Sequence, residues 1–227
     1  ELLTGEYTGA AVLTDLVMTT NAPKNVVVGN YIVVWVAGWY YDGTHSWSAY
    51  DNLGNAYTRI FSDAAAIKFR VAMFSAPVTV AGALTSITAS GEGIGTVSYH
   101  VAGCSALYDE TVNLTSYVED NDTAAVTSLS GGPVTQAEGL QLYAGAVGGD
   151  GADGNISGWT APTGFTIASS RYVAGNAPSV FLCHRYGTID NQTLTSTWTT
   201  SRAARALRGP GAVWSSFIPQ IYRWRSP

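Results

Sequence analysis

Charged residues are scarce in this sequence. Only 12% of its 227 residues are Asp, Glu, Lys or Arg, whereas 46% are hydrophobic. An ordinary soluble domain carries about twice that charged fraction, so this chain can bury a large core but has few charges to solvate its surface. Two explanations stay open: partner molecules cover part of the surface, or Ser, Thr, Asn and Gly solvate it.

Cysteines are also few, and metal-binding spacings are missing. Cys104 and Cys183 each lie in a strand-like run, which suits either two buried thiols or one disulfide between two halves of the chain. The chain has no Cys-x-x-Cys or His-x-x-x-His spacing of the kind that binds zinc. No apolar run reaches the roughly 18 residues of a membrane helix, so no membrane span is expected.

Helical periodicity is nearly absent. Only Asp63–Lys68 and Ser201–Leu207 have a composition that suits a short turn of helix. Runs rich in Val, Ile, Thr, Tyr and Trp recur instead, separated by Gly, Asn, Asp and Pro, which is typical of consecutive β-strands. The strands are expected at residues 11–19, 30–40, 56–61, 69–76, 84–90, 96–103, 111–117, 125–130, 140–147, 164–172, 179–187, 193–199 and 212–223.

What the sequence does have is an internal repeat. Gly29–Gly38 reads GNYIVVWVAG, and Glu138–Val147 reads EGLQLYAGAV. Each copy is followed by a Gly/Asp loop, a tryptophan (Trp47 or Trp159) and further strand-like runs. A repeat of this length is too long for a solenoid unit, so it indicates two related halves of one body.

The sequence therefore predicts an all-β protein formed by a single large antiparallel β-sandwich of two pseudo-repeated halves. Residues 1–28 would form an N-terminal arm and first strand, and 29–227 the sandwich. The halves are expected at about 29–130 and 134–227, joined by the short Ser130–Pro133 break, with a basic C-terminal strand at 212–225. The two copies of the repeat should occupy equivalent, central positions.

Catalytic motifs are missing as well. There is no Gly-x-Ser-x-Gly elbow and no phosphate-binding glycine loop between a strand and a helix. Cys183 adjoins His184, but neighbours in a strand point to opposite faces and would not form a thiolate–imidazole couple. We expect no enzyme and no cofactor. The weak metal candidate is a calcium loop of Asp150, Asp153 and Asn155, which a plain glycine-rich hairpin explains more simply.

Aromatic residues gather near the first copy of the repeat. Tyr40, Tyr41 and Trp47 flank a polar loop, and exposed rings there would stack on a sugar. Packing in the core or in a protein interface is the favoured interpretation. A glycan is therefore a secondary candidate partner.

The two ends of the chain are the candidate contact surfaces. Residues 201–227 contain five arginines and no acid, although the whole chain has a net charge of −5. Such a tail suits contact with the acidic body of a neighbouring copy better than nucleic acid, because lysines are absent from it. Extended apolar-aromatic arms can also join a neighbour's sheet edge, unless they form outer strands of their own sandwich. The expected interface residues are Leu2, Leu3, Tyr7, Arg202, Arg205, Arg208, Trp214, Tyr222, Arg223, Trp224 and Arg225.

Four motifs follow one another in a recognisable order. They are Gly29–Val34 (GNYIVV), Asp51–Thr58 (DNLGNAYT), Val71–Ala76 (VAMFSA) and Thr96–Gly103 (TVSYHVAG). This order resembles β-sandwich domains of phage virion proteins and secreted bacterial surface proteins. The resemblance extends from about Gly29 to Arg225 and implies a jelly-roll-like sandwich used for assembly or surface display.

The resemblance has departures and transfers no catalytic residue. Asn30 stands where those domains have Asp, and His100–Gly103 stands where they have Glu-Tyr-Ser-Gly. It implies a non-enzymatic structural protein on the virion exterior or an extracellular surface, such as a capsid-decorating, tail or fibre subunit. Its partners would be copies of itself and neighbouring virion or surface proteins. The alternatives are a carbohydrate-binding or adhesin module and a subunit of an extracellular filament.

Overall fold

The protein is built from β-strands and turns. The computed structural model describes residues 1–9, 15–39, 46–62, 69–92, 99–109, 112, 118–148, 159–171 and 178–210, and these contain no helix. The strands are β1 (Thr4–Gly9), β2 (Asp15–Val26), β3 (Tyr31–Trp39), β4 (Ser46–Asp51), β5 (Thr58–Ser62), β6 (Phe69–Pro77), β7 (Gly82–Glu92), β8 (Tyr99–Tyr108), β9 (Val118–Gly148), β10 (Thr166–Arg171) and β11 (Ser179–Pro210).

The first eight strands form one antiparallel sheet that curls on itself. Its order is β4-β7-β2-β1-β8-β3-β6-β5, and its two outermost strands contact each other. The Arg59 Nη1 of β5 donates to the Trp47 carbonyl of β4 at 3.5 Å. The curled sheet encloses an apolar core, to which strands near both ends of this order contribute. This is the arrangement of an eight-stranded jelly roll.

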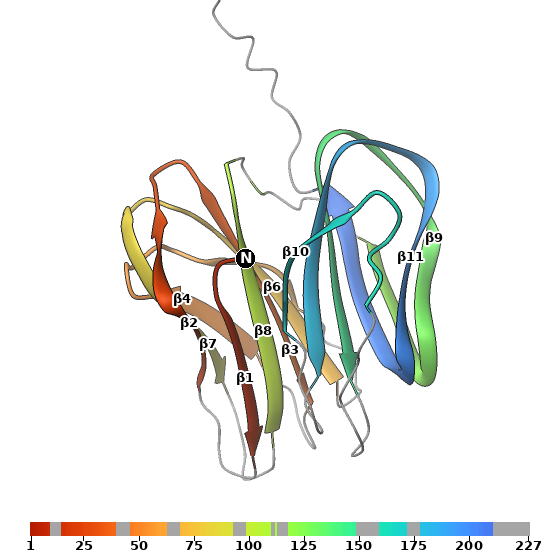
Figure 1. Cartoon of the computed structure of the whole chain (residues 1–227), viewed down its shortest axis with the longest axis horizontal. Coiled ribbons are helices and arrows are strands. Elements are labelled where there is room, and N and C mark those ends of the chain that lie inside the picture. Colours follow the sequence, from red (N-terminus) through yellow and green to blue (C-terminus); the bar gives the residue numbers. More distant parts are fainter. Residues whose placement is uncertain are drawn as a thin grey trace, which may run out of the picture.

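The second sheet has the order β10-β11-β9 and contains two long, bent strands (Figure 1). Residues 140–147 of β9 pair with 179–186 of β11, and residues 141–148 pair on their other side with 203–210. The same stretch of β11 also pairs with 118–122 of β9. The second half thus repeats the strand neighbours of the first, with 140–147 in the central place that β3 holds between β6 and β8.

The two sheets pack back to back through the same face of the repeated strand (Figure 1). Val33 and Trp35 of the first half, and Leu142 and Ala144 of the second, all point into one core between the sheets. The alternate residues of these strands point into two further cores, one inside each half. The central strand must therefore be apolar on both faces, because one face packs in the core between the sheets and the other in the core of its own half. This explains why β3 has no alternation of polar and apolar residues.

Two local irregularities recur in both halves. The pairing of β5 with β6 shifts register between Arg59 and Phe61, and the pairing of β10 with β11 shifts between Ile167 and Ser169. The turns before these strands contain Gly54 and Gly164, each with a φ of 83° that favours glycine. Bulges and left-handed glycines are specific features of a fold, so their recurrence supports the duplication.

The all-β antiparallel sandwich expected from the sequence is confirmed, as is the central place of both repeat copies. The position of the join differs from expectation. Ser130–Pro133 lie within β9, and the chain passes from one sheet to the other between Tyr108 and Val118. Ser201–Leu207, a candidate helical turn, belong to β11, because this stretch pairs with β9 on both of its sides.

The DNLGNAYT motif forms a hydrogen-bonded turn between β4 and β5. The carboxylate of Asp51 accepts from the backbone N–H groups of Leu53, Gly54 and Asn55 at 2.9, 2.7 and 3.1 Å. It also accepts from Asn55 Nδ2 at 3.0 Å and from the Tyr57 hydroxyl at 3.1 Å. Burial, followed by the charge of Asp51, raises the pKa of Tyr57 well above its usual range. The motif thus has a structural role.

We expect Asp51→Ala to lower the free energy of unfolding by on the order of 3 kcal/mol, because it leaves several buried donors without an acceptor. Asp51→Asn keeps one acceptor oxygen and should cost less. Urea unfolding measures both. Asp15→Ala is the control: its carboxylate accepts one 3.4 Å bond from Tyr50, and the change should stay within about 0.5 kcal/mol. A loss for Asp51→Ala as small as the control's contradicts this role.

Gly145 lies where the second half meets both its own core and the first half. It pairs with Phe181, whose ring occupies the space that a Cβ on Gly145 would need. Its carbonyl accepts from Trp35 Nε1 at 3.0 Å across the central core. We expect Gly145→Ala to destabilise the fold by about 1–3 kcal/mol through overpacking.

The matched test adds Phe181→Leu, because the smaller side chain makes room for the new methyl group. The double variant should lose less stability than the sum of the two single variants in thermal or urea unfolding. Strictly additive losses would show that Phe181 and residue 145 do not compete for space.

Candidate functional site

The sequence-predicted sugar residues do not form a site in the described structure. Trp47 is 4% exposed and packs in the core of the first half, so its ring offers no face to a sugar. Tyr40 and Tyr41 lie outside the described residues, as do Asp150, Asp153 and Asn155 of the candidate calcium loop. Among the residues that the structure describes, no cluster of three His, Cys, Asp or Glu side chains could hold a metal ion.

The N-terminal residues expected at an interface belong to the protein's own core. Leu2 and Leu3 are buried, and the backbone of Leu3 forms hydrogen bonds with Ser105 of β8. The strand that follows, β1, has β2 on one side and β8 on the other, so it is not an extended arm. Tyr7 lies in this strand, and its side chain is not among those described.

The C-terminal interface prediction stays a prediction. Arg202, Arg205 and Arg208 lie in β11, although their side chains are outside the described part of the structure. The remaining residues expected at the interface lie outside the described ranges; they are Trp214, Tyr222, Arg223, Trp224 and Arg225.

The two cysteines are free thiols in different cores. Cys104 lies between the two sheets, and Cys183 lies inside the second half. Burial raises the pKa of both thiols, that of Cys183 to about 12, so neither is a thiolate at neutral pH. No disulfide therefore joins the two cysteines in the structure.

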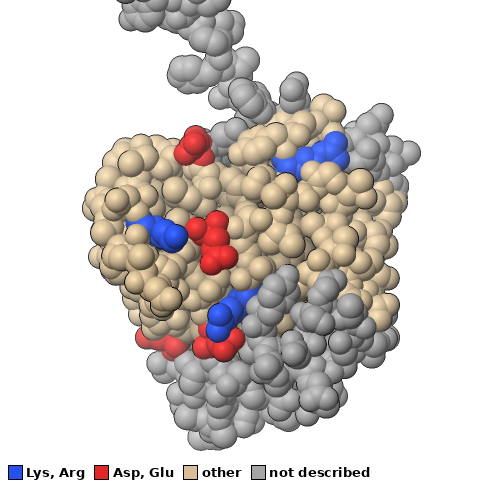
Figure 2. Space-filling model, in the orientation of Figure 1, with Lys and Arg blue, Asp and Glu red and all other residues tan. Residues whose placement is uncertain are grey.

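The outer faces of the described strands are solvated by hydroxyl groups. Figure 2 shows that most of the described surface on one side carries neither an acid nor a base. On the hairpin between β9 and β11, the outward positions are Ser128, Ser130, Thr193, Thr195 and Thr197. Ser and Thr thus supply much of the polarity that charged residues would otherwise provide.

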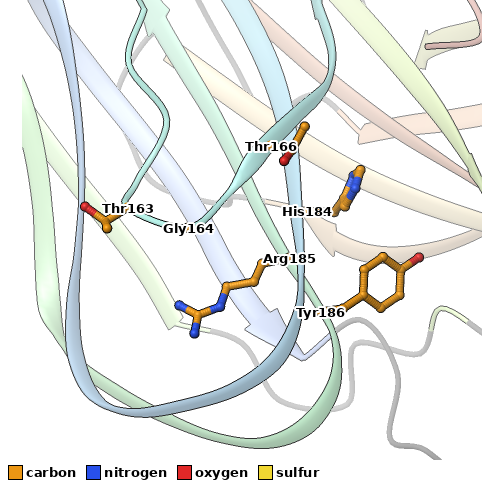
Figure 3. A pocket seen from close by; sticks show the side chains of 6 residues that line it. All are labelled: Thr163, Gly164, Thr166, His184, Arg185 and Tyr186. Carbon is orange, nitrogen blue, oxygen red and sulfur yellow. The ribbon is translucent and has the colours of Figure 1, made fainter.

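A surface depression of about 460 Å³ lies where β10 begins beside β11 (Figure 3). Three consecutive residues of β11 contribute to it, and successive residues of a strand point to opposite sides. Figure 3 shows Arg185 pointing toward the turn before β10, with His184 and Tyr186 on the other side of the strand. Its lining residues are Thr163, Gly164, Thr166, His184, Arg185 and Tyr186.

The turn before β10 holds the arginine in place. Gly164 has the positive φ that this turn requires, and a Cβ built there would lie 3.2 Å from Nη1 of Arg185. Nη2 of Arg185 donates to the Thr188 carbonyl at 3.0 Å. The guanidinium therefore lies along one border of the depression, in tight contact with the space that a Cβ at position 164 would occupy.

The rings of His184 and Tyr186 form the other border, and Tyr108 packs against His184 from below the surface. The His184 ring lies edge-on to Tyr108 at 5.6 Å and to Tyr186 at 5.7 Å between ring centroids. Tyr108 is buried, whereas Tyr186 is 51% exposed. Nδ1 of His184 and the Tyr108 hydroxyl are buried atoms without a hydrogen-bond partner among the described residues. Burial, followed by the charge of the N-terminal ammonium group, lowers the pKa of His184. Its imidazole is thus neutral at neutral pH.

This site was not predicted from the sequence. His184 was considered only as the neighbour of Cys183, and Arg185 and Tyr186 read as the end of a strand. The sequence feature that indicates this site is the change from the apolar run at residues 179–183 to three consecutive polar or aromatic residues. Their proximity to Thr163 and Thr166 comes from the pairing of β10 with β11, which a single sequence does not reveal.

The lowered pKa of His184 makes stability depend on pH. The unfolded chain, with an ordinary histidine pKa of about 6.5, binds the proton more readily than the folded one. The contribution of neutral His184 is therefore present above that pH and is lost as the pH falls below it. As the pH is lowered from 7.5 to 5.5, we expect the free energy of unfolding, measured with urea, to fall less for His184→Gln than for the wild type. Parallel losses in the two proteins would contradict this.

The described residues contain no helix with the length and hydropathy to cross a membrane. Comparison with known proteins assigns no family to the chain, so the likeness to virion and surface-protein domains stays an expectation. No family model, curated protein or solved structure matches this chain.

Proposed function

We propose that this chain is a non-enzymatic structural subunit on the exterior of a particle, such as a capsid-decorating, tail or fibre protein of a phage virion. The sequence resemblance points to that class, and the body suits it: two antiparallel β-sheet halves are packed back to back through a continuous core. The buried thiols with raised pKa are not nucleophiles, which agrees with a role in assembly.

The observation that carries the proposal is an exposed apolar patch at one end of the first half. Val27, Val28 and Val80 are 58%, 66% and 45% exposed. Their two turns lie side by side, because Gly29 N donates to Val78 O at 3.2 Å and Val78 N donates to Asn30 O at 2.8 Å. We call these three residues the valine patch.

The valine patch fits a contact with a neighbouring subunit. Single exposed apolar residues are ordinary, but a group on adjacent turns marks a surface that a partner covers. Fully burying a valine is worth about 1.5–3 kcal/mol, so two of them alter an affinity by tenfold or more.

We expect Val27→Ser/Val28→Ser to weaken self-association or particle attachment at least about tenfold, because it removes the apolar surface. Sedimentation velocity over a concentration series measures self-association, and co-sedimentation with the native particle measures attachment. Val17→Ser is the matched control, since Val17 is 51% exposed on the outer face of β2. It should associate like the wild type.

Two results would overturn the proposal. One is a wild-type protein that stays monomeric at every concentration and does not attach to particles. The other is a double valine variant that associates as tightly as the wild type and the Val17→Ser control.

A further inference from the structure

We propose that the depression between β10 and β11 is a glycan-binding site, in which a pyranose ring lies against Tyr186. The proposal stands on the geometry of this depression and is independent of the assembly role of the valine patch. Trp47, one of the aromatic residues that the sequence suggested for sugars, is buried in the core of the first half and takes no part in it.

The exposure of Tyr186 is the first reason. Most large rings in the described structure are buried, among them Trp35, Tyr143, Phe74 and Phe181. Tyr186 instead keeps 51% of its surface exposed at the edge of a depression, and His184 supports its ring from one side. An aromatic ring presented in this way offers an apolar face with a polar tip, which matches the C–H face and the hydroxyl rim of a sugar.

The polar groups around Tyr186 are the second reason. Thr163 and Thr166 are exposed and provide hydroxyl groups that both donate and accept. A sugar hydroxyl is both donor and acceptor, so it can satisfy groups of either kind.

The charge of the lining narrows the class of ligand. Among the described residues that line the depression, Arg185 is the strongly basic one and none is Asp or Glu. This composition disfavours cations and basic peptides. The Arg185 guanidinium, held against Gly164 and Thr188, suits ring hydroxyls or a sugar carboxylate better than a phosphate, which usually meets several cations or backbone N–H groups.

The size and shape of the depression fit a sugar at the end of a chain. Its volume of about 460 Å³ lies in the usual range of small-molecule sites, roughly 300–1,000 Å³. It is open to solvent on the side where Tyr186 is exposed, so further residues of a glycan can extend away from the protein. A bacterial surface polysaccharide and a host glycan share this chemistry.

The experiment uses the full chain on a glycan array that carries bacterial polysaccharides and host glycans. Saturation-transfer-difference NMR with methyl glycosides of glucose, galactose, N-acetylglucosamine and glucuronic acid follows it. Tyr186→Ala removes the ring, and His184→Gln keeps a neutral polar group in place of the imidazole. We expect Tyr186→Ala to bind at least about tenfold more weakly than the wild type, and His184→Gln to bind more weakly as well.

The matched control is Tyr50→Ala, because Tyr50 is 48% exposed on β4 and belongs to the other half of the protein. It should bind within about twofold of the wild type, as should the double valine variant. Unchanged unfolding midpoints show that the variants are folded. The proposal is overturned if the wild type binds no sugar in either assay. It is also overturned if Tyr186→Ala binds like the wild type, or if Tyr50→Ala loses binding equally.

Discussion

The apolar core between the two sheets is the contact on which the rest of the structure depends. Its central side chain is Trp35, which is fully buried and donates its Nε1–H to the Gly145 carbonyl of the other half at 3.0 Å. A second link is the ion pair between Arg171 and Glu6 at 2.9 Å, but both side chains are partly exposed. A surface ion pair contributes at most about 1 kcal/mol, whereas each large apolar side chain in a core contributes about 1.5–3 kcal/mol. Apolar burial therefore joins the halves.

This core follows directly from the duplication. In each half, one face of the central strand points into the core of that half, and the other face points away from it. Both of these faces are apolar. Two bodies with the same uncovered apolar face bury it best against each other, as two copies do in a dimer. The surfaces that remain are hydroxyl-rich strands, the valine patch and the depression beside Tyr186. This arrangement explains how a chain with so few charges keeps a solvated exterior.

Much of the fold could be predicted from the sequence, because period-two patterns and turn residues report on strands directly. The apolar runs at Tyr31–Trp39 and 140–147 marked central strands, and the structure has them there. The join was misplaced because Ser130–Pro133 look like a break, yet they lie in a long strand that bends. The sequence does not distinguish an arm from a core strand at the N-terminal leucines, because an apolar terminus fits a core and an interface equally well. The depression was missed because its lining comes from separate segments, which only the pairing of β10 with β11 brings together.

The most direct test of the account is the hydrogen exchange of the Trp35 indole Nε1–H, followed by NMR in deuterated buffer. This proton lies in the core between the sheets and bonds to the second half, so it should exchange only when the whole protein unfolds. The account predicts that its exchange free energy equals the global unfolding free energy from urea denaturation. Rapid exchange of this proton while the strands of both halves stay protected would show that the halves separate without unfolding, and would contradict a structure organised around their shared core.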